Sequence, residues 1–126
     1  MLFRSTLIAA SPDSKPSLIV CPKSLIFNWK NEFEKFAPDI LVYQIYGGLQ
    51  ARKDLIDSIS NDKKIIYITA YDSLRNDIDL YKDKIFKYII LDEAQYIKNV
   101  QAEKSYILET TYVFISPILN DTKISL

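Results

Sequence analysis

The pair Asp92-Glu93 is the part of this sequence best suited to chemistry, because two carboxylates directly follow the apolar run Tyr88–Leu91. Such a run predicts a short buried strand. Nucleotide-hydrolysing α/β domains hold Mg²⁺ and position water at the end of such a strand. Asp92 is the predicted metal ligand and Glu93 the residue that orients water, since Mg²⁺ prefers hard oxygen donors. The alternative is that both acids only open the next segment, whose N-terminal dipole favours negative charge.

Two further predicted strands also end in polar residues. Pro22-Lys23-Ser24 follows the apolar run Ser17–Cys21, and Thr69-Ala70-Tyr71 closes the run that begins at Ile65. In open parallel sheets, ligands bind outside the carboxyl ends of the strands. The sequence therefore predicts one site to which several strand ends contribute.

Apolar runs and helical spacings alternate along the chain. The runs predict strands over Ser17–Cys21, Leu41–Ile45, Ile65–Thr69, Tyr88–Leu91 and Tyr112–Ile115. Helices are predicted from the N-cap Ser24 to Pro38, and over residues 50–60, 71–81 and 102–108. Strands that alternate with helices imply right-handed βαβ units, so the predicted fold is an α/β three-layer sandwich with a mainly parallel sheet.

Apolar spacing also predicts which helix faces turn inward. The first helix should bury an apolar face at three- and four-residue spacing, formed by Ile26, Trp29, Phe33 and Phe36. The three aromatic residues, Trp29, Phe33 and Phe36, are interpreted as core residues rather than as functional ones. Gly47-Gly48 predicts a sharp turn after the second strand.

Composition fits one soluble domain with a modest core: the chain has 126 residues, 48% of them hydrophobic. Lys and Arg total 16, as do Asp and Glu, so DNA binding would need a local basic patch. One cysteine and no histidine exclude a disulfide framework, a Cys/His zinc site and histidine catalysis. No apolar stretch approaches the length that spans a membrane.

Three motifs occur in an order and spacing that resemble one family. The stretch from Leu18 to Phe33 resembles motif Ia of the Swi/Snf-type helicase-like ATPases, a branch of helicase superfamily two. The stretch from Thr69 to Asp77 resembles their motif Ib. The string Asp92-Glu93-Ala94-Gln95-Tyr96-Ile97-Lys98-Asn99 is similar to their motif II, the Walker B box.

The resemblance implies a RecA-like (P-loop NTPase-type) lobe that uses ATP and Mg²⁺ to drive movement along double-stranded DNA. By this resemblance Asp92 would bind the Mg²⁺ of the nucleotide, and Glu93 would orient the attacking water. The candidates for DNA phosphate contacts are Lys23, Ser24, Thr69 and Arg75, since hydroxyls and cations beside a helix N-terminus suit an anion. For Lys23 and Arg75 the alternative is a solvated surface charge.

The sequence also departs from the family pattern. No Walker A loop is present, because the only glycines are Gly47 and Gly48 and no Lys-Thr follows them. The stretch from Val113 to Asn120 resembles motif III without its Thr-Gly part, and no second lobe follows. We therefore expect residues 1–126 to form a single partial RecA-like lobe that is inactive alone and whose uncovered sheet edge favours association.

Two functional alternatives remain open at this stage. The chain is either one half of a split ATPase that needs a complementing lobe, or a non-enzymatic domain that binds DNA or protein. With no membrane segment predicted, the expected location is the cytoplasm beside the nucleoid in a bacterium, or the nucleus in a eukaryote.

Overall fold

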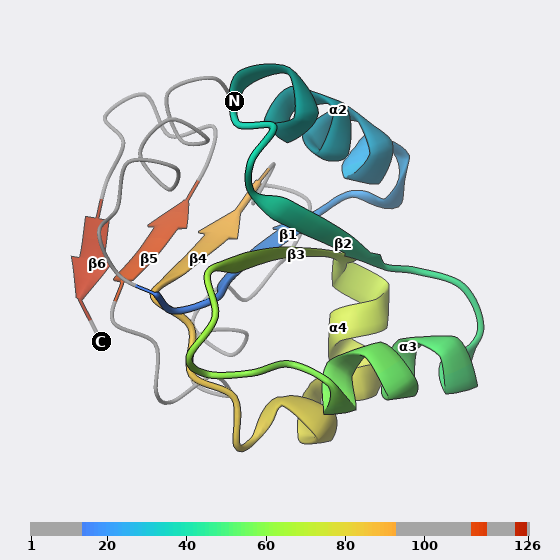
Figure 1. Cartoon of the computed structure of the whole chain (residues 1–126). Coiled ribbons are helices and arrows are strands. Elements are labelled where there is room, and N and C mark those ends of the chain that lie inside the picture. The colour runs from blue at the N-terminus through green and yellow to red at the C-terminus, as the bar shows by residue number, and fades with distance from the viewer. Residues whose placement is uncertain (1–13, 93–111, 116–122, 126) are drawn as a thin grey trace.

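The computed structural model describes residues 14–92, 112–115 and 123–125. The strands in these ranges form one six-stranded sheet in the order β2-β3-β1-β4-β5-β6 (Figure 1). Strands β1 to β5 are parallel to their neighbours, and β6 is antiparallel to β5. The strands are β1 (Ser17–Cys21), β2 (Leu41–Ile45), β3 (Ile65–Ala70), β4 (Tyr88–Leu91), β5 (Tyr112–Ile115) and β6 (Lys123–Ser125). The five predicted strands are confirmed, whereas β6 was not predicted.

Strand β1 lies inside the sheet, between β3 and β4. All five of its residues are buried, as expected for a parallel strand covered on both faces. Leu18 and Val20 belong to the apolar cluster on one face, and Ile19 and Cys21 belong to the cluster on the other. The continuous apolar run in the sequence therefore reflects two cores that share one strand.

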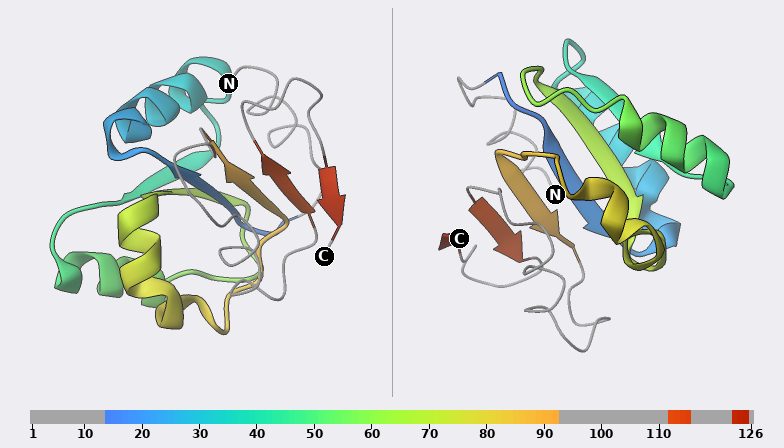
Figure 2. Two further views of the ribbon diagram at one scale, coloured as in Figure 1. Left: turned by 180° about the vertical axis from the view of Figure 1, so that it is seen from behind. Right: turned by 90° about the horizontal axis from the view of Figure 1, so that it is seen from below.

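Helices cover both faces, so the predicted three-layer α/β sandwich is confirmed (Figures 1 and 2). One face carries α2 (Ile26–Phe36), whose Trp29 and Phe33 are fully buried. The other carries α3 (Leu49–Asp57), α4 (Tyr71–Asp77) and the 3₁₀ turn η2 (Ile78–Tyr81). Within the described ranges, no helix has the length and apolar character needed to cross a bilayer.

Local details differ from the predicted helices. Ser24 does not cap α2: it lies in a short 3₁₀ turn, η1 (Lys23–Leu25), and Leu25 takes the N-cap position without a side-chain hydrogen bond. Phe36 is 45% exposed instead of inward, since it sits in the last turn of α2. The helix predicted over 71–81 tightens to 3₁₀ geometry after Asp77. The helix predicted over 102–108 lies outside the described residues.

Cys21 provides a pH-dependent test of the core. Burial raises the pKa of its thiol from 9.0 to about 12, and the nearby Asp92 charge adds to the shift. Because the unfolded chain loses this proton first, the contribution of Cys21 to stability is complete below pH 9 and declines as the pH rises toward 12. The decline approaches about 1.4 kcal/mol per pH unit.

Urea unfolding of the parent and Cys21→Ala chains between pH 8 and pH 11 measures this effect. We expect the parent to lose more stability than the variant over this range, so that the two curves converge. Both chains contain the same other ionisable side chains, so the comparison isolates the effect of Cys21. Parallel curves would contradict the buried, protonated thiol.

Candidate functional site

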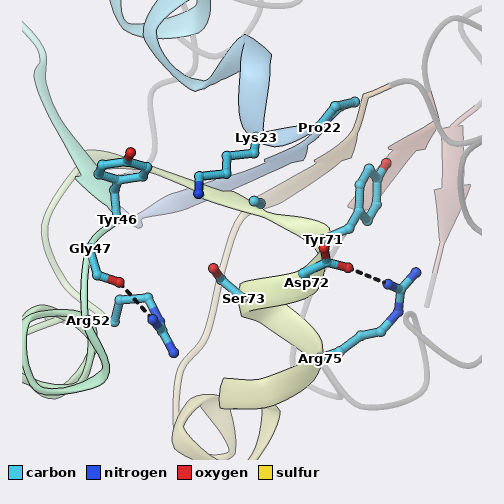
Figure 3. Close-up of a pocket in the computed structure, with 10 residues that line it drawn as sticks. Pro22, Lys23, Tyr46, Gly47, Arg52, Tyr71, Asp72, Ser73 and Arg75 are labelled. Carbon is cyan, nitrogen blue, oxygen red and sulfur yellow. Dashed lines mark hydrogen bonds and ion pairs between the residues drawn. The ribbon is translucent and has the colours of Figure 1, made fainter.

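The carboxyl ends of β1, β2 and β3 surround a pocket of about 580 Å³ (Figure 3). It brings together Lys23 and Arg75, which come from different motifs and were both predicted to contact phosphate. The lining residues are Pro22, Lys23, Tyr46, Gly47, Arg52, Ala70, Tyr71, Asp72, Ser73 and Arg75. A pocket at this end of a parallel sheet is where ligands of open α/β folds bind.

Lys23 and Arg75 supply positive charge that a ligand can reach. Lys23 is exposed, and its ammonium nitrogen lies 5.6 Å from the centre of the Tyr46 ring. Among the described residues it has no carboxylate partner. The Arg75 guanidinium donates to Asp72 over 3.1 Å, in a pair whose carboxylate is 93% exposed. Solvent-exposed pairs contribute little, so the pair with Asp72 does not by itself prevent Arg75 from contacting another anion.

Arg52 lines the same pocket but is tied to the protein. Its Nε and Nη2 atoms donate to the two carboxylate oxygens of Asp77 over 2.7 and 3.1 Å, and Nη1 donates to the carbonyl of Gly47 over 2.7 Å. The Asp77 side chain is completely buried. Gly47 has a φ of +105°, which residues with a Cβ rarely adopt. Arg52 thus fixes the turn between β2 and α3, and its charge is compensated.

Two of the predicted contacts lie elsewhere. Ser24 is exposed on η1 but does not line the pocket. Thr69 is fully buried, and alternation along β3 places it on the same face of the sheet as Tyr67. Its buried hydroxyl does not line the pocket, so the structure does not bring Thr69 together with Lys23 and Arg75 there. Lys98, the further basic residue of motif II, lies outside the described residues.

Asp92 directly follows β4 and is only 4% exposed. Its backbone N–H donates to the Val20 carbonyl over 2.8 Å. Its carbonyl accepts a hydrogen bond from the Tyr71 hydroxyl over 2.7 Å, and its Oδ2 accepts one from Trp29 Nε1 over 2.8 Å. Glu93, the second predicted catalytic carboxylate, lies outside the described residues.

The chemistry of Asp92 fits the Mg²⁺ that its motif implies. A carboxylate is a hard oxygen donor. The hydrogen bond from Trp29 uses only Oδ2, so Oδ1 is the oxygen that would bind the metal. In the ranges that the structure covers, no three acidic, histidine or cysteine side chains cluster as a metal cage. Mg²⁺ bound with a nucleotide needs only one or two carboxylates, because phosphates and waters complete its shell.

The sequence contained a partial signal for the bonds around Asp92. The helical spacing predicts Trp29 as a core residue, and it is fully buried. A buried indole N–H usually needs an acceptor, so a polar partner for Trp29 was to be expected, although its identity was not. The sequence places Tyr71 next to a strand end, but its bond to Asp92 joins the start of α4 to the end of β4, two points far apart in the sequence, and leaves no local pattern.

Comparisons with known proteins agree on one family. A family model described as the SNF2-related domain matches residues 2–114. A protein named as an uncharacterized ATP-dependent helicase of Mycoplasma genitalium is 42% identical over 84 residues, which are 67% of this chain and 8% of the helicase. The TATA-binding protein-associated factor MOT1 of Saccharomyces cerevisiae is 42% identical over 88 residues, covering 70% of this chain and 5% of that protein.

A solved structure is similar over nearly the whole chain. It is the SWI2/SNF2 ATPase core of Sulfolobus solfataricus in complex with double-stranded DNA, with a TM-score of 0.67 and 28% sequence identity. The match covers 92% of this chain and 24% of that one. The present chain thus spans a small part of each relative's length.

Proposed function

The chain belongs to the family of the SNF2-related domain, and from that membership and the pocket we propose that it is the DNA-contacting, Walker B-bearing lobe of an ATP-dependent DNA translocase. One observation carries the proposal. Lys23 of motif Ia and Arg75 of motif Ib lie far apart in the sequence yet line a single pocket. The DNA in the similar Sulfolobus complex supports duplex DNA as the ligand.

The charges of the pocket suit a modest phosphate contact. Arg52 is neutralised by the buried Asp77, so Lys23 and Arg75 are the cations of the pocket that we expect to contact a phosphate. Cations at such positions bind the DNA backbone without reading sequence. Because net charge is zero, no wider basic field strengthens the attraction.

We expect weak, salt-dependent binding of the purified chain to a short fluorescein-labelled DNA duplex, measured by anisotropy. Each neutralised phosphate contributes about 0.9 to the slope of log affinity against log salt, so two contacts predict a roughly tenfold loss between 50 and 200 mM salt. Lys23→Ala should reduce the slope by about one unit, and Lys23→Ala with Arg75→Ala should remove most of it.

Lys63→Ala is the matched control, since Lys63 is exposed but precedes β3 at the opposite end of the sheet. It should leave affinity and slope unchanged. Tight binding that persists in the double variant, or an equal effect of Lys63→Ala, would show that DNA binds elsewhere.

On the nucleotide side, we assign Asp92 as the Mg²⁺ ligand and Glu93 as the residue that orients water. Mg²⁺ would neutralise charge on the transferred phosphate. Asp92 is prepared for this role by its burial and by the bond from Trp29, which holds its carboxylate in one orientation. The assignment of Glu93 rests on its place in the Walker B motif.

We expect the purified chain alone to release no phosphate from ATP above background, with or without DNA. Its 126 residues contain no Gly-rich loop ending in Gly-Lys-Thr, and phosphoryl transfer depends on cradling the phosphates. A malachite green assay measures this. DNA-stimulated release that disappears in Glu93→Gln would show that the chain completes the site by itself.

A further inference from the structure

Asp92 is fixed at three atoms by three different elements. Its N–H is bonded to β1, its carbonyl to Tyr71 at the start of α4, and its carboxylate to Trp29 of α2. We propose that Trp29 and Tyr71 are positioning residues for the Asp92 carboxylate, and that Tyr71 relays occupation of the pocket to it. The inference rests on the proposed function for the identity of the pocket's ligand.

Trp29 determines how the carboxylate is presented. Its indole is fully buried and stacks on Phe33, with ring centres 6.2 Å apart and planes at 30°. The donor therefore cannot follow a rotating carboxylate, and Oδ2 is held at one point, 2.8 Å away. Hydrogen bonds of this kind to a ligating carboxylate orient it, and losing them typically weakens a metal site 10- to 100-fold.

Tyr71 connects this carboxylate with the pocket. Tyr71 is one of the residues that line the pocket, yet it is only 5% exposed and its hydroxyl is bonded to the Asp92 carbonyl. A ligand that displaces Tyr71 would shift its hydroxyl, and with it the peptide group of Asp92 that accepts the bond. Tyr71 belongs to the core of the α3 and α4 face and Trp29 to that of the α2 face, so the two layers meet at Asp92.

The free protein tests the positioning claim directly. Trp29 is the only tryptophan, so its indole N–H gives a single cross peak in a ¹H–¹⁵N spectrum. Tyr71→Phe removes the hydroxyl and keeps the ring. We expect it to displace the indole peak and to speed exchange of the indole proton roughly fivefold, the effect of one hydrogen bond, after correction for global stability.

Tyr43→Phe is the matched control, because Tyr43 is exposed on β2 and does not line the pocket. It should leave both the peak position and the exchange rate unchanged. If Tyr71→Phe also leaves them unchanged, the positioning claim is wrong, whether or not the protein binds DNA.

The relay is tested by adding duplex DNA until the anisotropy of each variant saturates. The parent's indole peak should move further at saturation, whereas the peak of Tyr71→Phe should stay in place. If the parent binds DNA but its peak does not move, or if both chains respond equally, the relay is wrong and the proposed function stands. No anisotropy change at any concentration would overturn the proposed function and the relay together, while the free-protein comparison still decides the positioning claim.

Discussion

Replacement of Arg52 by alanine is expected to lower the free energy of unfolding by about 3 kcal/mol. Arg52 makes a bidentate contact with Asp77, whose side chain is fully buried. Without the guanidinium, a buried carboxylate would remain unpaired, and removing one partner of such a pair typically costs 3–5 kcal/mol. We place the effect at the lower end because the Arg52 side chain is 14% exposed and water can reach it.

The next residue on the same helix provides the control. Lys53 pairs with Asp57 over 2.8 Å, close to the shorter Arg52 contact, but both side chains are about half exposed. Lys53→Ala should barely move the urea midpoint, because water replaces an exposed ion pair at little cost. Equal losses in the two variants would show that helix propensity, rather than the buried pair, determines the effect of Arg52→Ala.

Replacement of Trp29 by alanine is expected to cost about 4 kcal/mol, since it empties a fully buried site and removes the bond to Asp92. Trp29→Phe separates the two contributions. The phenyl ring retains much of the packing but lacks the N–H, and a lost hydrogen bond to a charged group accounts for about 2 kcal/mol. Chemical unfolding followed by circular dichroism measures all three chains.

Phe27→Ala is a suitable control from the same helix. Phe27 is 53% exposed and contacts the exposed ring of Tyr46, so its loss should cost less than about 1 kcal/mol. If Trp29→Phe were no more destabilising than Phe27→Ala, the hydrogen bond to Asp92 would have no measurable energetic role.

Features set by local pattern were predictable from the sequence. The strand ends at Cys21 and Leu91 agree with prediction because a continuous apolar run marks a buried parallel strand. The end of the edge strand β2 at Ile45 also agrees, although most of its residues are exposed or half-buried. The end at Ala70 differs by one residue. The placement of Lys23 and Arg75 in one pocket also followed, because parallel strands bring their carboxyl ends to the same edge of a sheet.

Features set by contacts between elements were not predictable in this way. Thr69 stands at a strand end, but only its partners decide that its side chain turns into the core. The Arg52–Asp77 pair joins α3 to α4, and either residue alone resembles an ordinary surface charge. Strand β6 is short and begins with a lysine, so nothing in its composition marks it as a partner for β5.

The central position of β1 also determines the order in which the chain can fold. Ser17 pairs with Ile66 on one side and with Tyr88 on the other. Strand β1 therefore cannot complete its pairing until β3 and β4, which follow it in the sequence, have formed. Strands β2 and β3 need only the α3 crossover between them and can pair first. Long loop closure slows folding, so insertion of β1 is the expected rate-limiting step. During synthesis α2 follows β1 directly and can cover Ile19 and Cys21, whereas both backbone edges of the run Leu18–Cys21 stay unpaired until β3 and β4 have emerged, so this run is the segment that we expect a nascent-chain chaperone to shield.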